Sequence, residues 1–191
     1  DRDIDVALPD GTRVVGTLGG LHGSVLLRAE YSRLAPKQRI RAWVRLVALA
    51  ATGGGPWTAV TLGRGTGHGL VKAGVGPIDQ GRAAGLLADL VALRRAGLRE
   101  PLPLPTVTAN SYATVRRGGA DAPAALQEAM RRWEVGAGAE RAEPAHTLVW
   151  GADGRGLTAE PGGPGGEPTR FGTLAMRLWA PLLAAEDVVR L

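Results

Sequence analysis

The fold is decided by the stretch that runs from Thr12 to Ala51, TRVVGTLGGLHGSVLLRAEYSRLAPKQRIRAWVRLVALAA. Polar and apolar residues alternate over 12–18 and again over 24–31, and this alternation predicts two strands. A helix is predicted to begin near Pro36, because proline suits the first helical turn, and to end at the glycines that follow Thr52. Two strands that lead into a long helix are therefore expected at the centre of the fold.

The predicted helix has two different faces. Its apolar residues recur at i, i+3 and i+4 positions, which predicts a stripe that packs on the core. These positions are Ile40, Trp43, Val44, Val47 and Ala51. A cation recurs at every fourth position on another face, at Lys37, Arg41 and Arg45, so these three side chains are predicted to lie beside one another.

Strands are also predicted on both sides of this stretch. Residues 4–8 alternate and are followed by the turn Pro9-Asp10-Gly11, which predicts a hairpin with the strand that begins at Thr12. Residues 57–62 and 70–75 read as two further strands. Their glycine-rich connector, 63–69, lacks the Gly-Lys-Ser/Thr ending of a phosphate-binding loop, and no helix is predicted after it. We expect the tip of a hairpin there.

The second half of the chain is predicted to be mainly helical. Asp79 and Asp121 are each expected to cap a helix, the first of which ends at Gly97. The remaining predicted elements are an extended Leu102–Pro105, a short helix over 111–117, a short strand or tether over Thr147–Trp150, and a final helix from Phe171 that Pro181 kinks or breaks. Residues 135–146 and 152–169 are rich in Gly, Pro and charge and are predicted to be flexible loops.

The order of these elements predicts an α/β (α+β) fold, with a mixed sheet flanked by helices. We expect a single domain over residues 1–191. Its strand–helix core is predicted to span about residues 1–78, and a helical part is predicted over about 79–191.

Composition limits the classes of function. Lys and Arg number 23 against 18 Asp and Glu, which gives a net charge of +5. This charge favours a polyanion such as nucleic acid as the partner. An abundance of arginine and glycine is also what the codons of a GC-rich genome produce. No cysteine is present, so disulfides and thiolate zinc sites are excluded. No apolar run is long enough for a membrane span, and a cytoplasmic location is expected. Because the chain begins at Asp1 without Met, we expect a piece of a longer protein.

Few residues form a recognisable catalytic or metal-binding pattern. His22, His68 and His146 lie far apart in the sequence, and none has a second ligand at metal-binding spacing, so structural or solvated histidines are expected. Carboxylates cluster only at residues 1–5 and at Glu186-Asp187, where solvated faces are expected. The sequence contains no nucleophile elbow, no His-Glu-x-x-His and no complete Walker loop.

The strand–strand–helix stretch resembles the core of the PD-(D/E)xK nuclease superfamily. Where members with RecB-type motifs carry a metal-binding aspartate after the first strand, this chain has Gly19. Where they carry D-x-K on the next strand, it has Arg28-Ala29-Glu30. The resemblance therefore implies a restriction-endonuclease-like fold with the metal site lost, no cofactor and no catalysis, since glycine and arginine offer Mg²⁺ no oxygen ligand.

A second alignment of the motif leaves open an active Mg²⁺-dependent nuclease. Pro9-Asp10 followed by Glu30 spells part of the motif in that register. The position two after Glu30, however, is Ser32 and not lysine. Arg33 comes one residue too late, which on a strand turns it to the opposite face.

Nearly the whole chain resembles the family of RecC C-terminal domains, found in the gamma subunit of exodeoxyribonuclease V, the RecBCD helicase–nuclease. The resemblance is strongest over 14–51. It continues at Leu86-Leu87-Ala88-Asp89-Leu90, at GLREPLPLP (97–105), at Leu148-Val149-Trp150-Gly151, at Arg170-Phe171-Gly172 and through Pro181-Leu182-Leu183.

This resemblance implies a non-catalytic scaffold and DNA-handling domain, acting in double-strand-break repair by homologous recombination. It implies RecB and RecD as partner subunits, double-stranded DNA or separated single strands as ligand, and a parent subunit that recognises the Chi hotspot. Lys37, Arg41 and Arg45 are then either phosphate contacts or an ordinary solvated face. A protein–protein interaction domain without a role on DNA is a further alternative.

Overall fold

The structure, a computed structural model, describes residues 1–65, 67, 69–136, 139–163 and 166–191. The chain forms two compact units. One unit is made of Asp1–Arg95 together with Ala185–Leu191, and the other is made of Ala96–Ala184. The predicted α/β architecture is confirmed, because a five-stranded mixed sheet is flanked by helices. The single-domain organisation expected from the sequence stays a prediction.

The first unit opens with the predicted hairpin. Strand β1 (Arg2–Ala7) pairs antiparallel with β2 (Arg13–Leu18) as a separate two-stranded sheet. Asp10 holds the turn, because its Oδ1 accepts a hydrogen bond of 2.9 Å from the Thr12 amide. Alternate residues of β1 are buried, as a half-buried strand requires.

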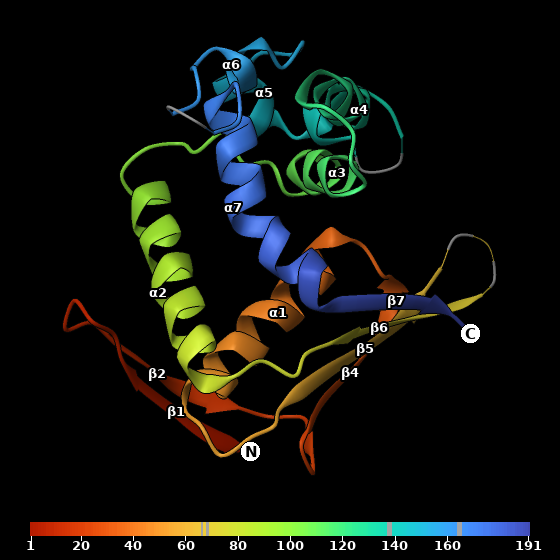
Figure 1. Cartoon of the computed structure of the whole chain (residues 1–191). Helices are drawn as coiled ribbons and strands as arrows, with labels where there is room; N and C mark the ends of the chain where they lie inside the picture. The colour runs from red at the N-terminus through yellow and green to blue at the C-terminus, as the bar shows by residue number, and fades with distance from the viewer. Residues whose placement is uncertain (66, 68, 137–138, 164–165) are drawn as a thin grey trace. The chain divides into compact units, whose positions relative to one another are not determined.

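The main sheet also belongs to the first unit and has the strand order β3-β4-β5-β6-β7 (Figure 1). Its strands are β3 (Leu21–His22), β4 (Val25–Arg33), β5 (Thr58–Arg64), β6 (Leu70–Val75) and β7 (Glu186–Arg190). β4 and β5 pair parallel and every other pairing is antiparallel. A parallel pair needs a long crossover, and here the crossover is a helix.

Helix α1 (Pro36–Ala51) makes that crossover between β4 and β5, with the bounds that the sequence predicts. It ends where Gly53 takes a φ of 79°, a conformation that glycine adopts without strain. The predicted core stripe is incomplete. Val44 is 39% exposed, whereas Leu46 and Leu49 are fully buried. The reason is that α1 contacts β5 as well as β1 and β2, so residues outside a single stripe are also covered.

The second helix, α2 (Gln80–Gly97), begins at the predicted cap, since Asp79 Oδ1 accepts a 2.8 Å hydrogen bond from the Arg82 amide. The boundary between the units falls in its last turn. No helix formed by the described part of the chain is long and apolar enough to cross a membrane.

Two packed helices, α3 (Thr106–Arg117) and α4 (Ala122–Glu134), form much of the second unit. Asp121 caps α4 as predicted, accepting from the Ala124 amide at 2.9 Å. The prediction that the short helix starts near Ser111 is wrong, because α3 starts at Thr106. Its first turn is capped from outside: the Glu140 carboxylate accepts hydrogen bonds from the amides of its second and third residues at 3.0 and 2.8 Å.

The strand or tether predicted over Thr147–Trp150 is wrong, because these residues lie in helix α5 (Pro144–Trp150). Pro144 starts the helix and Gly151, with a φ of 79°, ends it, so the caps override the strand preference of Thr, Val and Trp. The stretches predicted to be loops, 135–146 and 152–169, also contain the short helices η1 (Glu140–Ala142) and α6 (Arg155–Thr158).

Helix α7 (Arg170–Ala185) is the predicted final helix, and it continues through Pro181 instead of breaking there. Its residues Trp179 and Leu182 are fully buried. The chain then returns to the first unit as β7, a strand that was not predicted from the sequence.

Candidate functional site

Gly19 and Arg28, two of the three positions that the nuclease resemblance singles out, line one cavity of about 280 Å³ in the first unit. We call it the Arg28–Arg45 cavity. Its walls are formed by Gly19, Gly20, Leu26, Leu27, Arg28, Ala42, Arg45 and Thr61. The third position, Glu30, reaches the cavity through Arg28, because its Oε1 accepts a hydrogen bond from Arg28 Nε. The three positions therefore lie together.

The strand register explains this convergence. On β4, Leu26 and Arg28 point to the same face of the sheet, two residues apart. Their partners on parallel β5 are Ala59 and Thr61, whose side chains are buried. Arg28 and Glu30 extend along that face, with side chains 39% and 16% exposed.

Arg45 completes the cavity from α1. Its Nη2 donates a hydrogen bond of 2.8 Å to the backbone oxygen of Gly19. Its Nε is buried and has no hydrogen-bond partner among the residues that the structure describes. Lys37 and Arg41 are exposed instead, so the structure separates Arg45 from the two cations with which the sequence groups it. The contact between Arg45 and Gly19 was missed, because helical spacing does not show what lies beside a residue.

Asp10 and Glu30, the two carboxylates of the second alignment, have cationic partners. Asp10 accepts a 2.5 Å hydrogen bond from Arg95 Nη1 in addition to the bond from Thr12. The bonds from the backbone and hydroxyl of Thr12, with that from Arg95, lower the pKa of the exposed Asp10 carboxyl to about 2. Among the described residues, no group of three or more His, Asp or Glu is placed to hold a metal ion. Asp10 and Glu30, which form the motif in the second alignment, thus engage different arginines.

Glu186 was predicted to lie on a solvated face, and that prediction is wrong. Its side chain is 2% exposed and pairs with Arg39 of α1, whose Nε lies 2.9 and 3.0 Å from the two carboxylate oxygens. Strand β7 positions Glu186 beside Arg39. Because β7 was not predicted from the sequence, the ion pair between Glu186 and Arg39 could not be predicted either. At the other terminus, Asp3 and Asp5 are exposed as predicted, and they bind Thr17 and Arg13.

The histidines have ordinary surroundings where the structure describes them. His22 is exposed on β3. In the second unit, His146 Nδ1 lies 3.1 Å from the backbone oxygen of Glu140, and its ring lies 5.9 Å from that of Trp133. His146 therefore has the structural role that was predicted. His68 lies outside the described residues, and so do Thr66 in the same connector and residues 164–165 of the later glycine-rich loop.

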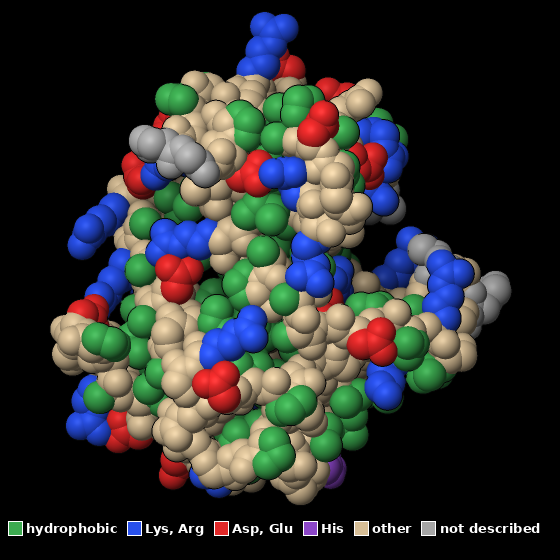
Figure 2. All heavy atoms as spheres, viewed as in Figure 1, with side chains coloured by type: hydrophobic (Ala, Val, Ile, Leu, Met, Phe, Trp, Pro, Cys, Tyr) green, Lys and Arg blue, Asp and Glu red, His purple; other side chains and the backbone are tan. Residues whose placement is uncertain are grey.

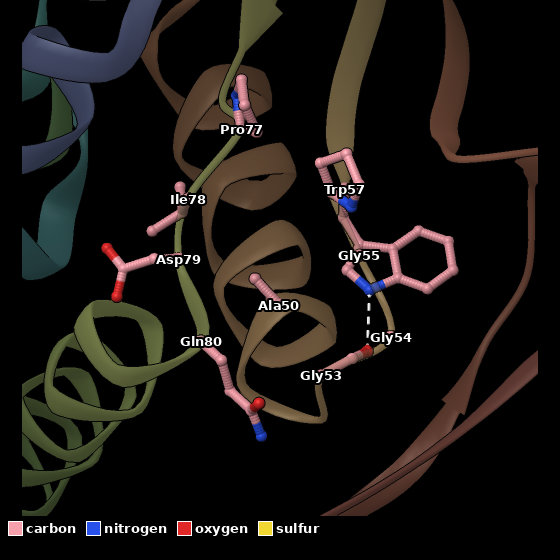
Figure 3. Close-up of a pocket in the computed structure, with 10 residues that line it drawn as sticks. Ala50, Gly53, Gly54, Gly55, Trp57, Pro77, Ile78, Asp79 and Gln80 are labelled. Atoms are coloured by element: carbon pink, nitrogen blue, oxygen red, sulfur yellow. Dashed lines mark hydrogen bonds between the residues drawn. The ribbon is translucent and has the colours of Figure 1, made fainter.

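A second hollow, of about 440 Å³, lies at the end of α1, between the glycine-rich segment 53–57 and the segment 77–80 (Figure 3). Polar groups there are bonded locally: Trp57 Nε1 donates to the Gly53 oxygen at 2.9 Å, and Gln80 Nε2 donates to the Ala51 oxygen at 3.4 Å. Arg2 covers the Trp57 ring at 4.9 Å. These contacts fix the junction between α1 and β5, which is a structural role.

Comparison with known proteins decides the family. The sequence model of the RecC C-terminal domain matches residues 1–117, more than half of the chain. This chain belongs to the RecC C-terminal domain family. The matched residues include every wall of the Arg28–Arg45 cavity.

Full-length RecC relatives match almost the entire chain. The RecBCD enzyme subunit RecC of Mycobacterium tuberculosis, in two strains, is 40% identical over 196 residues, and that of Mycolicibacterium smegmatis is 42% identical over 197 residues. Each match covers 98% of this chain but 18% of the relative. The chain thus spans less than a fifth of the length of these RecC subunits, and the family resemblance predicted from the sequence is confirmed.

Proposed function

We propose that this chain is a non-catalytic scaffold and DNA-handling domain of a RecBCD-type helicase–nuclease, acting in the cytoplasm in double-strand-break repair by homologous recombination. RecB and RecD are its partner subunits, and duplex DNA or its separated strands are its ligands. The parent subunit as a whole recognises the Chi hotspot. Membership of the RecC C-terminal domain family supports this role, and the Arg28–Arg45 cavity carries the non-catalytic part.

The cavity has the wrong charge for metal-dependent cleavage. Mg²⁺ binds oxygen ligands, preferably carboxylates, and phosphodiester hydrolysis uses the ion to activate water and to stabilise the leaving oxygen. The residues that line the cavity include two arginines and no carboxylate. Of the two acids nearby, Glu30 is engaged by Arg28, and the exposed Asp1 lies beside Gly19. These guanidinium groups repel a divalent cation.

A cleavage assay tests the absence of catalysis. The purified chain is incubated with linear duplex DNA and with single-stranded DNA in Mg²⁺ and then in Mn²⁺. We expect no metal-dependent cleavage from the wild type or from Glu30→Gln. The active-nuclease alternative makes the opposite prediction, namely robust cleavage that Glu30→Gln abolishes. Either result is read on a gel, with a chelator as the control for contaminating nucleases.

The exposed cations of α1 supply the proposed contact with DNA. Lys37 and Arg41 are exposed one turn apart, so both can reach phosphates of one strand. Replacing both with Ala should weaken duplex binding and reduce the slope of log K against log salt by about 2, since each phosphate contact contributes about 0.9. Fluorescence anisotropy across a salt series measures the slope.

The matched control removes two arginines elsewhere. Arg131 and Arg132 of α4 are about half exposed and pair with Glu128. Replacing them with Ala changes net charge by the same amount. An equal change of slope in the two double variants would contradict a local contact at Lys37 and Arg41.

A second candidate function, a protein–protein interaction domain, is favoured by the face of the main sheet opposite the buried Leu26 and Ala59. By register, Leu27, Leu70 and Val189 point to this face and are 40%, 53% and 37% exposed. Tyr31, on the same face of β4, is 91% exposed. Figure 2 shows hydrophobic side chains over the β6–β7 side of the sheet, with Lys and Arg beside them. Exposed apolar patches mark interaction sites.

Capture by the RecB or RecD subunit separates the two candidates. Replacing Tyr31 and Leu70 with Asp should abolish capture if the open sheet face is the docking surface. If this double variant loses capture and the chain binds no DNA at any salt concentration, the result would favour a protein–protein interaction domain without a role on DNA. Retained DNA binding with the slope predicted above would favour the DNA-handling domain.

A further inference from the structure

The Arg28–Arg45 cavity holds more hydrogen-bond donors than its own residues satisfy. Arg45 donates one hydrogen bond of 2.8 Å to the Gly19 oxygen, and its buried Nε has no partner among the described residues. A buried donor without a partner costs free energy, and the remaining N–H groups of the same guanidinium are left for an acceptor from outside the protein. Arg28 stands in the wall of the same cavity, 39% exposed, and its Nε is bonded to Glu30.

The charged residues in the cavity wall are both arginines. Glu30 offsets the charge of Arg28, but among the described residues the acceptor that Arg45 bonds is the neutral carbonyl of Gly19. None of the eight residues that form its walls is acidic. The walls and Glu30 together therefore carry a net charge of +1, and the carboxylate of the exposed Asp1 lies beside Gly19 at the edge of this set. Thr61, also in the wall, adds a hydroxyl that can donate to an oxygen.

We propose that this cavity binds a phosphate group between the guanidinium groups of Arg28 and Arg45. Guanidinium presents N–H donors in a planar fork that matches phosphate oxygens, and a partly enclosed site strengthens charge-assisted hydrogen bonds. Inorganic phosphate, the 5′-phosphate at a DNA end and an internal phosphodiester share this chemistry. The inference rests on the proposed function in one respect: that function makes a DNA strand the source of the phosphate group.

The test uses variants that change binding in opposite directions. Affinity of the full chain for inorganic phosphate is measured by calorimetry. Arg28→Gln removes a charged donor and should weaken binding about tenfold. Glu30→Gln removes the anion that competes for Arg28 and should strengthen binding. A purely structural role for the Arg28–Glu30 pair predicts no gain in affinity in Glu30→Gln.

Controls separate binding from folding. Arg132→Ala removes a half-exposed cation from α4, outside the cavity wall, and should leave phosphate affinity unchanged. Arg45→Gln should abolish phosphate binding. If this substitution unfolds the chain, Arg28→Gln and Glu30→Gln still test the proposal, because Arg28 is partly exposed and its replacement leaves the core intact. Equal affinity in wild type and Arg28→Gln, or no phosphate binding by the wild type, would overturn the proposal.

Oligonucleotides then distinguish the sources. A single strand with a 5′-phosphate is compared with the same strand ending in a 5′-hydroxyl. If the chain prefers the phosphorylated strand and Arg28→Gln loses that preference, the cavity binds the phosphate at a DNA end. If the chain binds the two strands equally and Arg28→Gln weakens binding of both, the cavity binds an internal phosphodiester. Phosphate binding without binding of either strand would contradict DNA handling but keep the cavity assignment. Strand binding that neither Arg28→Gln nor Glu30→Gln alters would refute the assignment and keep DNA handling.

Discussion

At the scale of single residues, Arg39 and Glu186 form the most buried ion pair among the described residues. Their side chains are 16% and 2% exposed, so neither charge is well solvated alone. Replacing Arg39 with Ala leaves the Glu186 carboxylate buried without its partner. Breaking a buried ion pair in this way costs about 3–5 kcal/mol. We expect a loss of that size in the free energy of unfolding, measured by urea denaturation.

An exposed pair provides the comparison. Arg13 and Asp5 are 65% and 53% exposed, and such pairs contribute about 0–1 kcal/mol. Arg13→Ala should therefore change stability little. A loss as small in Arg39→Ala would show that water reaches Glu186. The sequence could not reveal this pair, because 147 positions separate its members and Arg39 lies between two exposed cations on the same helix.

At the scale of elements, Glu167 ties α3 to the segment that precedes α7. Its Oε2 accepts a 2.6 Å hydrogen bond from the Tyr112 hydroxyl, and its Oε1 accepts one of 3.0 Å from Arg116 Nε. Burial alone would raise the pKa of Glu167, but the bonds from Arg116 and Tyr112, with the charge of Arg116, lower it below the ordinary 4.5. Burial and the neighbouring carboxylate raise the pKa of the Tyr112 hydroxyl.

A dependence of stability on pH follows for the second unit. Because the pKa of Glu167 is lower in the folded chain, its ionised form stabilises the fold above its unfolded pKa. That contribution is lost as the pH falls below about 4.5 and through the folded pKa. Glu167→Gln should therefore be less stable than wild type near pH 7, with a gap that narrows in acid. Urea denaturation from pH 7 to pH 3 measures the gap, and a gap that widens in acid would contradict the assignment.

The elements that could be predicted are those whose ends are fixed locally. Helix α1 has both signals, proline at its start and glycine beyond its end, and its bounds were found. Helix α5 has the same two signals at Pro144 and Gly151, but three residues with strand preference, Thr147, Val149 and Trp150, outweighed them in the prediction. The buried face of α1 was only partly found, since its contacts on two sides depend on tertiary packing.

At the scale of the whole molecule, the chain completes its main sheet with its last strand. Strand β7 pairs with β6 across more than a hundred residues of intervening chain, and no local pattern signals such a pairing. For the same reason the site was found only in part. The family resemblance brought Gly19, Arg28 and Glu30 together, whereas the inward turn of Arg45 depends on how α1 packs on the sheet.

Removing residues 186–191 tests this pairing. The truncation deletes β7, exposes the backbone of β6 as a sheet edge, and leaves Arg39 without Glu186. Amides of β6 (Leu70–Val75) should then exchange with deuterium at least about tenfold faster by mass spectrometry. The β1–β2 hairpin, which forms a separate sheet, serves as the internal reference. Deleting Leu191 alone removes one hydrogen bond to Leu70 and should have a small effect, and unchanged protection of β6 in the longer truncation would contradict the pairing.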